Sequence, residues 1–407
     1  MIDFEEAQEL VFCNCRKLSV TQIPVSKSLG YVLAESIRAS TPLPRFDASA
    51  VDGFAVRSSD LVESSHSNET CLRLTGTLAA GDKRILKLNK GTTIRILTGA
   101  QIPAGADAVV MQEQVRIRKD IVSFSTPANA GDNIRFAGEE FKKGEIVLES
   151  GTLITPPVVA MLAIIGRQRV RVRRKPRVAL IVTGNELQPP GTRLRRGKIY
   201  DSNTPALVAA LQATGIDSVR TFRTHDTPRQ IEQAFRKVLT DSDVVLSSGG
   251  VSVGSSDFVK DVLAELNVKS VFWRIAIKPG KPIYFGTKKK VLIFGLPGNP
   301  VAAQLGFQLL IKPAILRMMG MSSVAPLTLP AILTHDLRKK AGRMEFVRGI
   351  LSTDDAGQIT VRPARGQDSH MVGGLAKANC LIHFPKDQER ISAGSKVRIS
   401  LLNWGVL

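Results

Sequence analysis

Four glycine-bearing turns in the second half of the chain each follow an apolar run and could bind an anion. They are Thr183-Gly184-Asn185-Glu186, residues 247–258 (SSGGVSVGSSDF), Lys278-Pro279-Gly280-Lys281-Pro282 and Leu296-Pro297-Gly298-Asn299-Pro300. Backbone N–H groups at such turns, and the N-termini of helices that follow them, can point at a phosphate. One such turn alone is more often a plain strand-to-helix connection, but four turns with two lysines favour an anion site.

The spacing within residues 247–258 excludes two common phosphate-binding motifs. The stretch contains no GK[ST], so it is not a Walker A loop. Its glycines do not follow GxGxxG either, so it is not a dinucleotide fingerprint.

Carboxylates recur beside these turns at Glu186, Asp201, Asp226 and Asp257. They would repel a phosphate unless a cation lay between, and Mg²⁺ is the natural choice because it binds carboxylates together with substrate phosphates. Asp226 and Asp257 could instead cap the helices that follow them.

A further acidic stretch, PRFDASAVDGFAV, contains Asp47 and Asp52 in the first half of the chain. Asp52-Gly53 is a turn signal, so a hairpin turn is one interpretation. A carboxylate presented to a partner domain is the other, and the pattern leaves both open.

The elements that position the four turns alternate between strand and helix from Arg177 onward. Strands are predicted at 177–184, 218–225, 243–250, 270–277 and 281–286, and helices at 204–215 (capped by Asn203 or Thr204), at 228–239, from Ser256-Asp257, and after the cap Asn299. This alternation predicts a mostly parallel sheet covered on both faces, with ligands at the carboxyl ends of its strands.

The remaining segments predict a multidomain α/β plus β protein. A discontinuous helical domain (1–40 and 137–174), with helices at 5–12 and 28–37, receives an inserted β domain (41–136), and a three-layer α/β domain (175–322) is followed by a C-terminal β domain (323–407). The alternating arginines and valines of residues 169–178 indicate a solvated strand entering a new domain.

Composition limits the class of partner. The 407 residues carry a net charge of +20, which favours anionic partners. Aromatic residues are only 5% and no nucleic-acid-binding motif appears, so no nucleic-acid partner is expected. The longest apolar run is eight residues, the N-terminus is acidic and no CxxC is present, so we expect a cytoplasmic protein with no membrane span and no structural zinc site.

Nine segments occur in one order over most of the chain and resemble the molybdopterin molybdenumtransferase family, the MoeA-like proteins. They are PRFDASAVDGFAVR, IRILTGAQIPAGADAVVMQE, NIRFAGEEFKKGE, VTGNEL, IYDSNTP, SSGGVSVGSSDF, IKPGKP, GLPGNPVAA and GRMEFVRG. The resemblance implies an elongated helical domain with an inserted β domain, an α/β molybdenum-cofactor-synthesis domain and a C-terminal β-barrel-like domain. It also implies a homodimer with its site at the interface.

The reaction implied by the resemblance is the insertion of molybdate into adenylylated molybdopterin with release of AMP, assisted by Mg²⁺. A molybdopterin adenylyltransferase is a possible delivery partner. A non-catalytic scaffold or weakly active paralogue, and a tungstate-inserting variant, remain alternatives.

The same resemblance assigns roles to individual residues. Asp52, Glu186, Asp257 and Lys278 match catalytic positions, and Glu140, Glu186 and Asp257 match metal positions. Expected substrate-binding residues are Thr98, Asp201, Asp226, Ser247, Gly249, Gly250, Ser252, Gly254, Arg274, Lys281, Pro297, Gly298, Asn299, Arg348 and Ser369. Four positions depart from the family pattern: Glu140 replaces an aspartate, Asn185 an aspartate, Arg274 a lysine and Ala302 a serine.

Overall fold

The computed structural model describes residues 1–250 and 258–405. The chain divides into two compact units, here called unit 1 (Met1–Glu35, Ser150–Ala160 and Gln168–Leu407) and unit 2 (Ser36–Glu149 and Met161–Arg167). The finer division into four domains stays a prediction.

A six-stranded sheet in unit 1 contains the predicted α/β strands. Its order is β17 (Val219–Thr224), β14 (Val178–Thr183), β18 (Val244–Ser248), β22 (Val291–Leu296), β21 (Tyr284–Lys288) and β19 (Lys269–Trp273). The first four strands are parallel, and β21 runs antiparallel to both of its neighbours. The predicted strand 270–277 is wrong in extent, because Arg274 has a φ of 80° and separates β19 from β20 (Ile277–Lys278).

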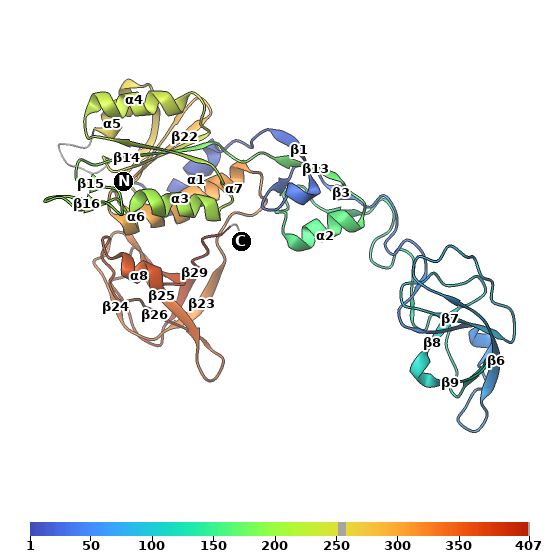
Figure 1. The fold of residues 1–407 in the computed structure, drawn as a ribbon. Coiled ribbons are helices and arrows are strands. Elements are labelled where there is room, and N and C mark those ends of the chain that lie inside the picture. The colour runs from blue at the N-terminus through green and yellow to red at the C-terminus, as the bar shows by residue number, and fades with distance from the viewer. Residues whose placement is uncertain (251–257, 406–407) are drawn as a thin grey trace. The chain divides into compact units, whose positions relative to one another are not determined.

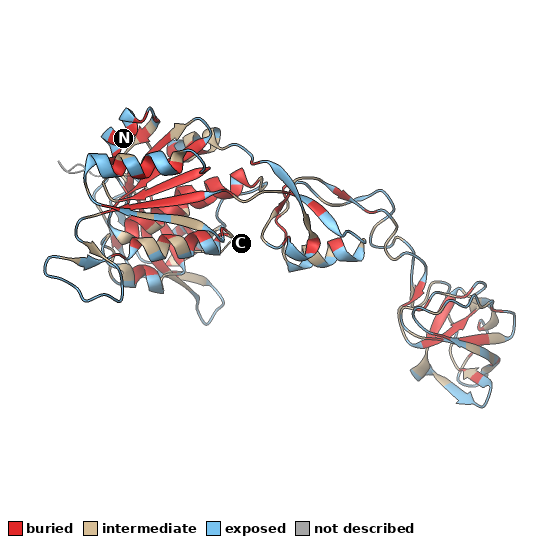
Figure 2. Cartoon of the chain, turned by 45° about the horizontal axis from the view of Figure 1, so that its top comes forward, coloured by how far each residue is buried: buried red, intermediate tan, exposed pale blue. Residues whose placement is uncertain are grey.

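Helices cover both faces of this sheet, as Figure 1 shows. Alternate residues of β14 explain the three layers: Leu180 packs with α3 (Asn203–Ala213) and α6 (Pro300–Gly306), whereas Ile181 packs with α4 (Pro228–Leu239) and α5 (Val259–Glu265). Every residue of β14 and β22 is buried, as expected for strands covered on both sides (Figure 2). The first face also packs against α1 (Phe4–Asn14), η4 (Phe307–Ile311) and α7 (Lys312–Met318).

Two predicted helix starts can be compared with the structure. Helix α6 begins at Pro300 after the cap Asn299, as expected. Helix α3 is capped by Ser202 and starts at Asn203, one residue before the predicted start, so the cap prediction there is wrong. The predicted start at Ser256-Asp257 lies outside the described residues.

The predicted helix at 28–37 is also wrong. Gly30 has a φ of 75°, which ends helical geometry, and the chain then forms β2 (Val32–Leu33) and β3 (Ile37–Arg38). Strand β2 pairs with β13 (Arg169–Arg173), which pairs in turn with β1 (Val20–Pro24). Within β13 the valines are buried and the arginines point outward, so the predicted solvated strand is confirmed.

Unit 2 contains the expected β module. Its sheet has the order β8 (Ala108–Met111), β5 (Gly53–Val56), β7 (Thr92–Ile96), β6 (Thr70–Leu78), β10 (Ile121–Phe124) and β9 (Val115–Arg118). Two-stranded pairs add β4 (Ala48–Ser49) with β11 (Ile134–Arg135), and β3 with β12 (Ile146–Leu148). Helix α2 spans Pro156–Ile164, and short 3-10 turns cover Ser58–Asp60 and Gln112–Gln114.

The C-terminal segment closes into a barrel of five strands within unit 1. The ring is β25 (Met344–Thr353), β26 (Ile359–Pro363), β23 (Thr328–Leu333), β29 (Lys396–Leu401) and β27 (Cys380–Phe384), and β27 pairs back onto β25. Strand β20 pairs with β25, so the turn at Lys278 is attached directly to the barrel. Helix α8 (Val372–Lys377) and the pair β24 (Leu337–Arg338) with β28 (Arg390–Ile391) complete this part.

No helix within residues 1–250 and 258–405 is long and apolar enough to cross a bilayer.

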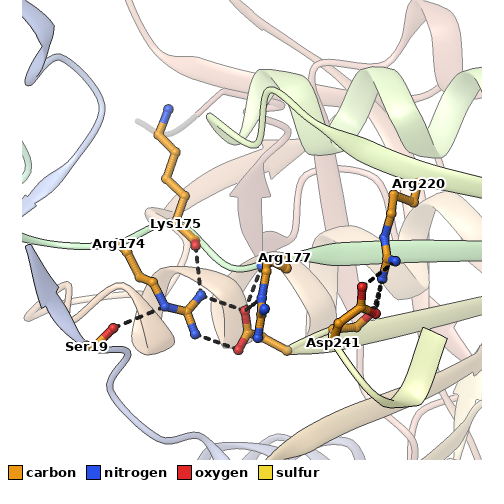
Figure 3. A network of polar contacts seen from close by, with 8 residues as sticks. Ser19, Arg174, Lys175, Arg177, Arg220 and Asp241 are labelled. Carbon is orange, nitrogen blue, oxygen red and sulfur yellow. Dashed lines mark hydrogen bonds and ion pairs between the residues drawn. The ribbon is translucent and has the colours of Figure 1, made fainter. Parts of the chain in front are cut away.

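A polar network fixes the starts of β14 and β18 (Figure 3). Asp243 accepts hydrogen bonds from both terminal nitrogens of Arg174, at 2.6 and 2.7 Å, and from the backbone N–H of Arg177 at 2.8 Å. Burial opposes ionisation of Asp243, but these hydrogen bonds and the two arginine charges hold its pKa below the ordinary 3.8. Arg220 makes a similar but more exposed pair with Asp241.

Replacing Asp243 by Asn should lower the free energy of unfolding by about 2 kcal/mol, because Arg174 loses its charged partner in a site where the Asp243 side chain is only 12% exposed. The matched change Asp241→Asn should cost less than about 1 kcal/mol, because that carboxylate is 50% exposed. Urea unfolding of both variants measures this difference.

The Asp243 contribution should also depend on pH. Since the folded pKa is depressed, the stabilisation is complete above the unfolded value near 3.8 and is lost as pH falls through the lower folded pKa. The stability gap between wild type and Asp243→Asn should therefore begin to shrink only as pH falls below about 3.8, and a gap that shrinks near neutral pH would contradict this assignment.

Candidate functional site

A cavity of about 1110 Å³ opens at the carboxyl ends of β14, β18 and β22. All four glycine-bearing turns contribute to its lining, the second through Ser248, Gly249 and Gly250. The cavity also receives Arg343 and residues 367–370 from the barrel. The structure thus brings together turns that are more than 100 residues apart in sequence.

Gly249 permits the close approach of two of these turns. Its φ of 92° lies in the left-handed region, and a Cβ there would lie 2.7 Å from the carbonyl oxygen of Thr183. Gly298 differs, because a Cβ there would meet nothing within 4 Å. Backbone packing therefore requires glycine at 249, whereas at 298 the absence of a side chain leaves open space at the cavity wall.

The buried side chain of Asn203 ties the turns to one another. Its Nδ2 donates to Ser248 Oγ at 2.8 Å and to the Gly298 carbonyl at 2.8 Å. Asn203 Oδ1, Thr183 Oγ1 and Ser247 Oγ are buried and find no partner among the described residues. Thr183 and Asn203 line the cavity, although these two oxygen atoms are themselves buried, whereas Ser247 is fully buried and is not part of the lining.

The cavity carboxylates differ in the hydrogen bonds and ion pairs that they make with other residues of the protein. Asp201 accepts hydrogen bonds from the backbone N–H and hydroxyl of Thr204 and pairs with Arg223 at 3.1 Å. Glu186 lines the cavity and is exposed, and its carboxylate makes no hydrogen bond or ion pair within residues 1–250 and 258–405. Of the two, Glu186 is the carboxylate free to bind a cation.

Asp226 is joined to the turn at 183–186 and does not cap α4, whose cap is Thr227. Asn185 donates its backbone N–H to Asp226 Oδ2 at 3.1 Å, and its side-chain oxygen accepts the Asp226 N–H at 3.3 Å. The asparagine at 185 therefore orients Asp226, which an aspartate could not do without placing two negative charges side by side.

Two lysines of the KPGKP turn lie in the cavity with different partners. Lys278 forms an ion pair with Glu345 of the barrel at 3.0 Å. Lys281 is exposed and unpaired among the described residues. Lys281 is therefore the free cation of this turn.

The barrel segment is attached to the start of α6. Asn299 Nδ2 donates to Ser369 Oγ at 2.9 Å, and the Val301 N–H donates to the Ser369 carbonyl at 3.2 Å. Arg348 does not line the cavity. It is fully buried, and its Nη2 donates to the carbonyls of Gly366 at 2.7 Å and Asp368 at 3.3 Å. Arg348 therefore holds the segment that contributes residues 367–370 to the cavity without lining the cavity itself. Burial lowers the pKa of Arg348.

Several predicted site residues are not part of this cavity. Asp52 and Thr98 belong to unit 2, where Asp52 Oδ1 accepts both the N–H and the hydroxyl of Thr98 at 2.7 Å, which lowers the Asp52 pKa. Glu140 is an exposed residue of the same unit. Arg274 does not line the cavity, and its guanidinium lies 4.0 Å from the centre of the Trp273 ring.

Ser252, Gly254 and Asp257 lie outside the described residues. Among residues 1–250 and 258–405, no cluster of three or more His, Cys, Asp or Glu side chains could hold a metal ion. The predicted metal set of Glu140, Glu186 and Asp257 stays a prediction.

Sequence reasoning missed part of the lining. Thr183 and Ser248 end β14 and β18 and belong to two of the predicted glycine-bearing turns, so their position at the carboxyl edge was a usable signal. Tyr200, Arg343, Gln367, Asp368 and His370 had no such local signal.

Comparison with known proteins shows relatives over nearly the whole chain. Family models match residues 2–166 (MoeA N-terminal region, domain I and II), 179–317 (probable molybdopterin binding domain) and 330–402 (MoeA C-terminal region, domain IV). A molybdopterin molybdenumtransferase of Haemophilus influenzae is 38% identical over 374 residues, which cover 91% of each chain. One of Staphylococcus epidermidis is 35% identical over 98% of this chain and 95% of its own.

Solved structures give the same likeness. A molybdopterin biosynthesis MoeA protein of Pyrococcus horikoshii OT3 matches with a TM-score of 0.84 at 31% identity, covering 98% of this chain and 100% of its own. A second structure of that protein matches with a TM-score of 0.79. The predicted fold class is thereby confirmed.

The glycine contrast yields a stability prediction. Gly249→Ala should lower the free energy of unfolding by about 2 kcal/mol or more, because the new methyl group would collide with the Thr183 carbonyl in a left-handed backbone. Gly298→Ala should change it by less than about 0.5 kcal/mol. Denaturant unfolding of the two variants tests this prediction. Equal losses of unfolding free energy in both variants would contradict the requirement for glycine at position 249.

Proposed function

Since the chain belongs to the molybdopterin molybdenumtransferase family and is a transferase, we propose that it inserts molybdate into adenylylated molybdopterin with release of AMP. The observation that carries this proposal is the cavity in which four glycine-bearing turns meet. Backbone N–H groups and lysines at these turns suit a ligand with phosphates.

Different residues of the cavity would bind the substrate phosphates and the molybdate. Lys281, which has no partner among the described residues, is positioned to hold phosphate charge, while Lys278 is oriented by Glu345. Molybdate, as the second substrate, is an oxyanion that the hydroxyl of Ser369 and the amide of Asn299 could contact at the barrel side.

Carboxylate oxygens are the ligands that Mg²⁺ prefers, and Glu186 and Asp226 bring two carboxylates to the cavity. Glu186 and Asp226 would hold it, with Asp257 as the third candidate. Bound there, Mg²⁺ would neutralise substrate phosphate charge.

We also propose that the protein acts as a homodimer, in which the β module of one protomer presents Asp52 to the cavity of its partner. The Thr98 hydrogen bonds that keep Asp52 ionised support this role, since they hold a carboxylate ready in an exposed position. A molybdopterin adenylyltransferase that hands over its product remains a candidate delivery partner in the cytoplasm.

The test is to supply adenylylated molybdopterin, Mg²⁺ and molybdate, and to measure AMP release and active cofactor. Glu186→Gln should lower the rate at least about tenfold and raise the Mg²⁺ concentration required, because it removes a free carboxylate without removing any hydrogen bond within the described residues. Asp257→Ala should abolish AMP release.

Glu265→Gln, an exposed change of the same kind on α5, is the matched control and should leave the rate unchanged. Wild-type protein that releases no AMP would overturn the proposal. Replacing molybdate by tungstate in the same assay decides which oxyanion is preferred.

A further inference from the structure

A basic loop, residues 189–198, joins β15 (Leu187–Gln188) to β16 (Ile199–Tyr200) and projects from the α/β part in Figure 1. We call it the arginine loop. Gln188 Oε1 accepts the Arg195 N–H at 2.8 Å, and Gln188 Nε2 donates to the Arg193 carbonyl at 3.2 Å. The Tyr200 hydroxyl donates to the Thr192 carbonyl at 2.9 Å, so hydrogen bonds between side chains and the backbone give the loop a defined shape.

The arginine side chains of this loop form no polar contacts with the described residues of the protein. Arg193, Arg195 and Arg196 are all exposed, and their guanidinium groups make no hydrogen bond or ion pair in the described part of the chain. Lys198 differs, because its Nζ donates to the Asn185 carbonyl at 2.6 Å. Arg174 and Arg220, by contrast, form ion pairs with Asp243 and Asp241.

The loop residues also enclose a hollow of about 680 Å³, whose lining includes residues 192–196 and Gln188. Three guanidinium groups around one hollow offer planar pairs of N–H donors, the geometry that suits phosphate oxygens.

The neighbouring cavity lacks an excess of positive charge. Among the described residues, its lining contains the four carboxylates of Glu186, Asp201, Asp226 and Asp368 and the three cations of Lys278, Lys281 and Arg343. The walls alone would therefore attract an anionic substrate weakly. The arginine loop is joined directly to that lining, because Leu187, Ile199 and Tyr200 at its two ends belong to the cavity wall.

From these observations we propose that the arginine loop is a binding site for diphosphate-bearing anions, which captures the substrate through its diphosphate before the substrate enters the cavity. This role rests on the proposed function for the identity of the substrate. It assigns to Arg193, Arg195 and Arg196 the attraction that the cavity walls do not supply. Long-range attraction of this kind raises the rate of association and weakens with salt.

The direct test is a calorimetric titration with inorganic diphosphate at roughly 0.02 M salt, where charge attraction is little screened. The variant Arg193→Ala/Arg195→Ala/Arg196→Ala should bind about tenfold more weakly than wild type. Replacing the same three residues by lysine should recover only part of the affinity, because the charge remains but the paired guanidinium N–H donors are lost.

A control of equal charge change is Lys237→Ala/Lys269→Ala/Lys290→Ala. These exposed lysines lie at the end of α4 and at the starts of β19 and β22, the edge of the sheet opposite the cavity. The control should bind diphosphate as wild type does. Wild type that does not bind, an alanine variant with unchanged affinity, or an equal loss in the control would each overturn the proposal.

A second readout uses the reaction. In the AMP-release assay the triple alanine variant should show about a tenfold higher KM with unchanged kcat, and the difference should fade at roughly 0.5 M salt. An unchanged KM at low salt overturns the capture role. If wild type released no AMP, the proposed function would fail, while the diphosphate titration would still decide whether the loop binds anions.

Discussion

The amide of Asn203 is the interaction on which the cavity depends. It is buried at the start of α3, and its two hydrogen bonds reach Ser248 at the end of β18 and Gly298 after β22. Three connections from three strands are thereby fixed against one another. Because a buried amide that lost these partners would remain unsatisfied, the arrangement is stable only when all three turns are in place.

The charged side chains of the cavity fall into two groups: those that are paired with other residues of the protein and those that are free to bind a ligand. Asp201 is committed to Thr204 and Arg223, and Lys278 is committed to Glu345. Glu186 and Lys281 have no such partners among the described residues, so the lining of one cavity contains an unpaired carboxylate and an unpaired lysine ammonium group. A site of that composition suits a phosphate ligand bridged by a cation better than it suits either ion alone.

The sequence predicted the α/β strands well because their apolar runs are buried on both faces and are bounded by glycine turns. The same reasoning failed at 28–37, where a short apolar run fits a helix or a strand and the decision comes from pairing with β13, more than 130 residues away. The carboxyl ends of the strands could be located from the sequence, because an apolar run followed by a glycine-bearing turn marks each of them. Of the barrel residues 367–370, only Ser369 was expected, from the family resemblance, because only tertiary packing brings this segment to α6.

Asn203 shows the same limit on a smaller scale. A helix cap was the natural prediction for an asparagine before a helical run, yet its side chain makes no capping bond and joins two distant turns instead. The ordered motifs of the whole chain, rather than any one turn, indicated the family, because one glycine turn is compatible with many ligands.

The most direct measurement of the central claim is hydrogen–deuterium exchange of the full-length protein with and without adenylylated molybdopterin. The account predicts that peptides covering the turns at 183–186, 248–250, 278–282 and 297–300 become protected together, with the β strands of unit 2 away from Asp52 unchanged. Protection confined to other surfaces, or none at these four turns at saturating ligand, would contradict it.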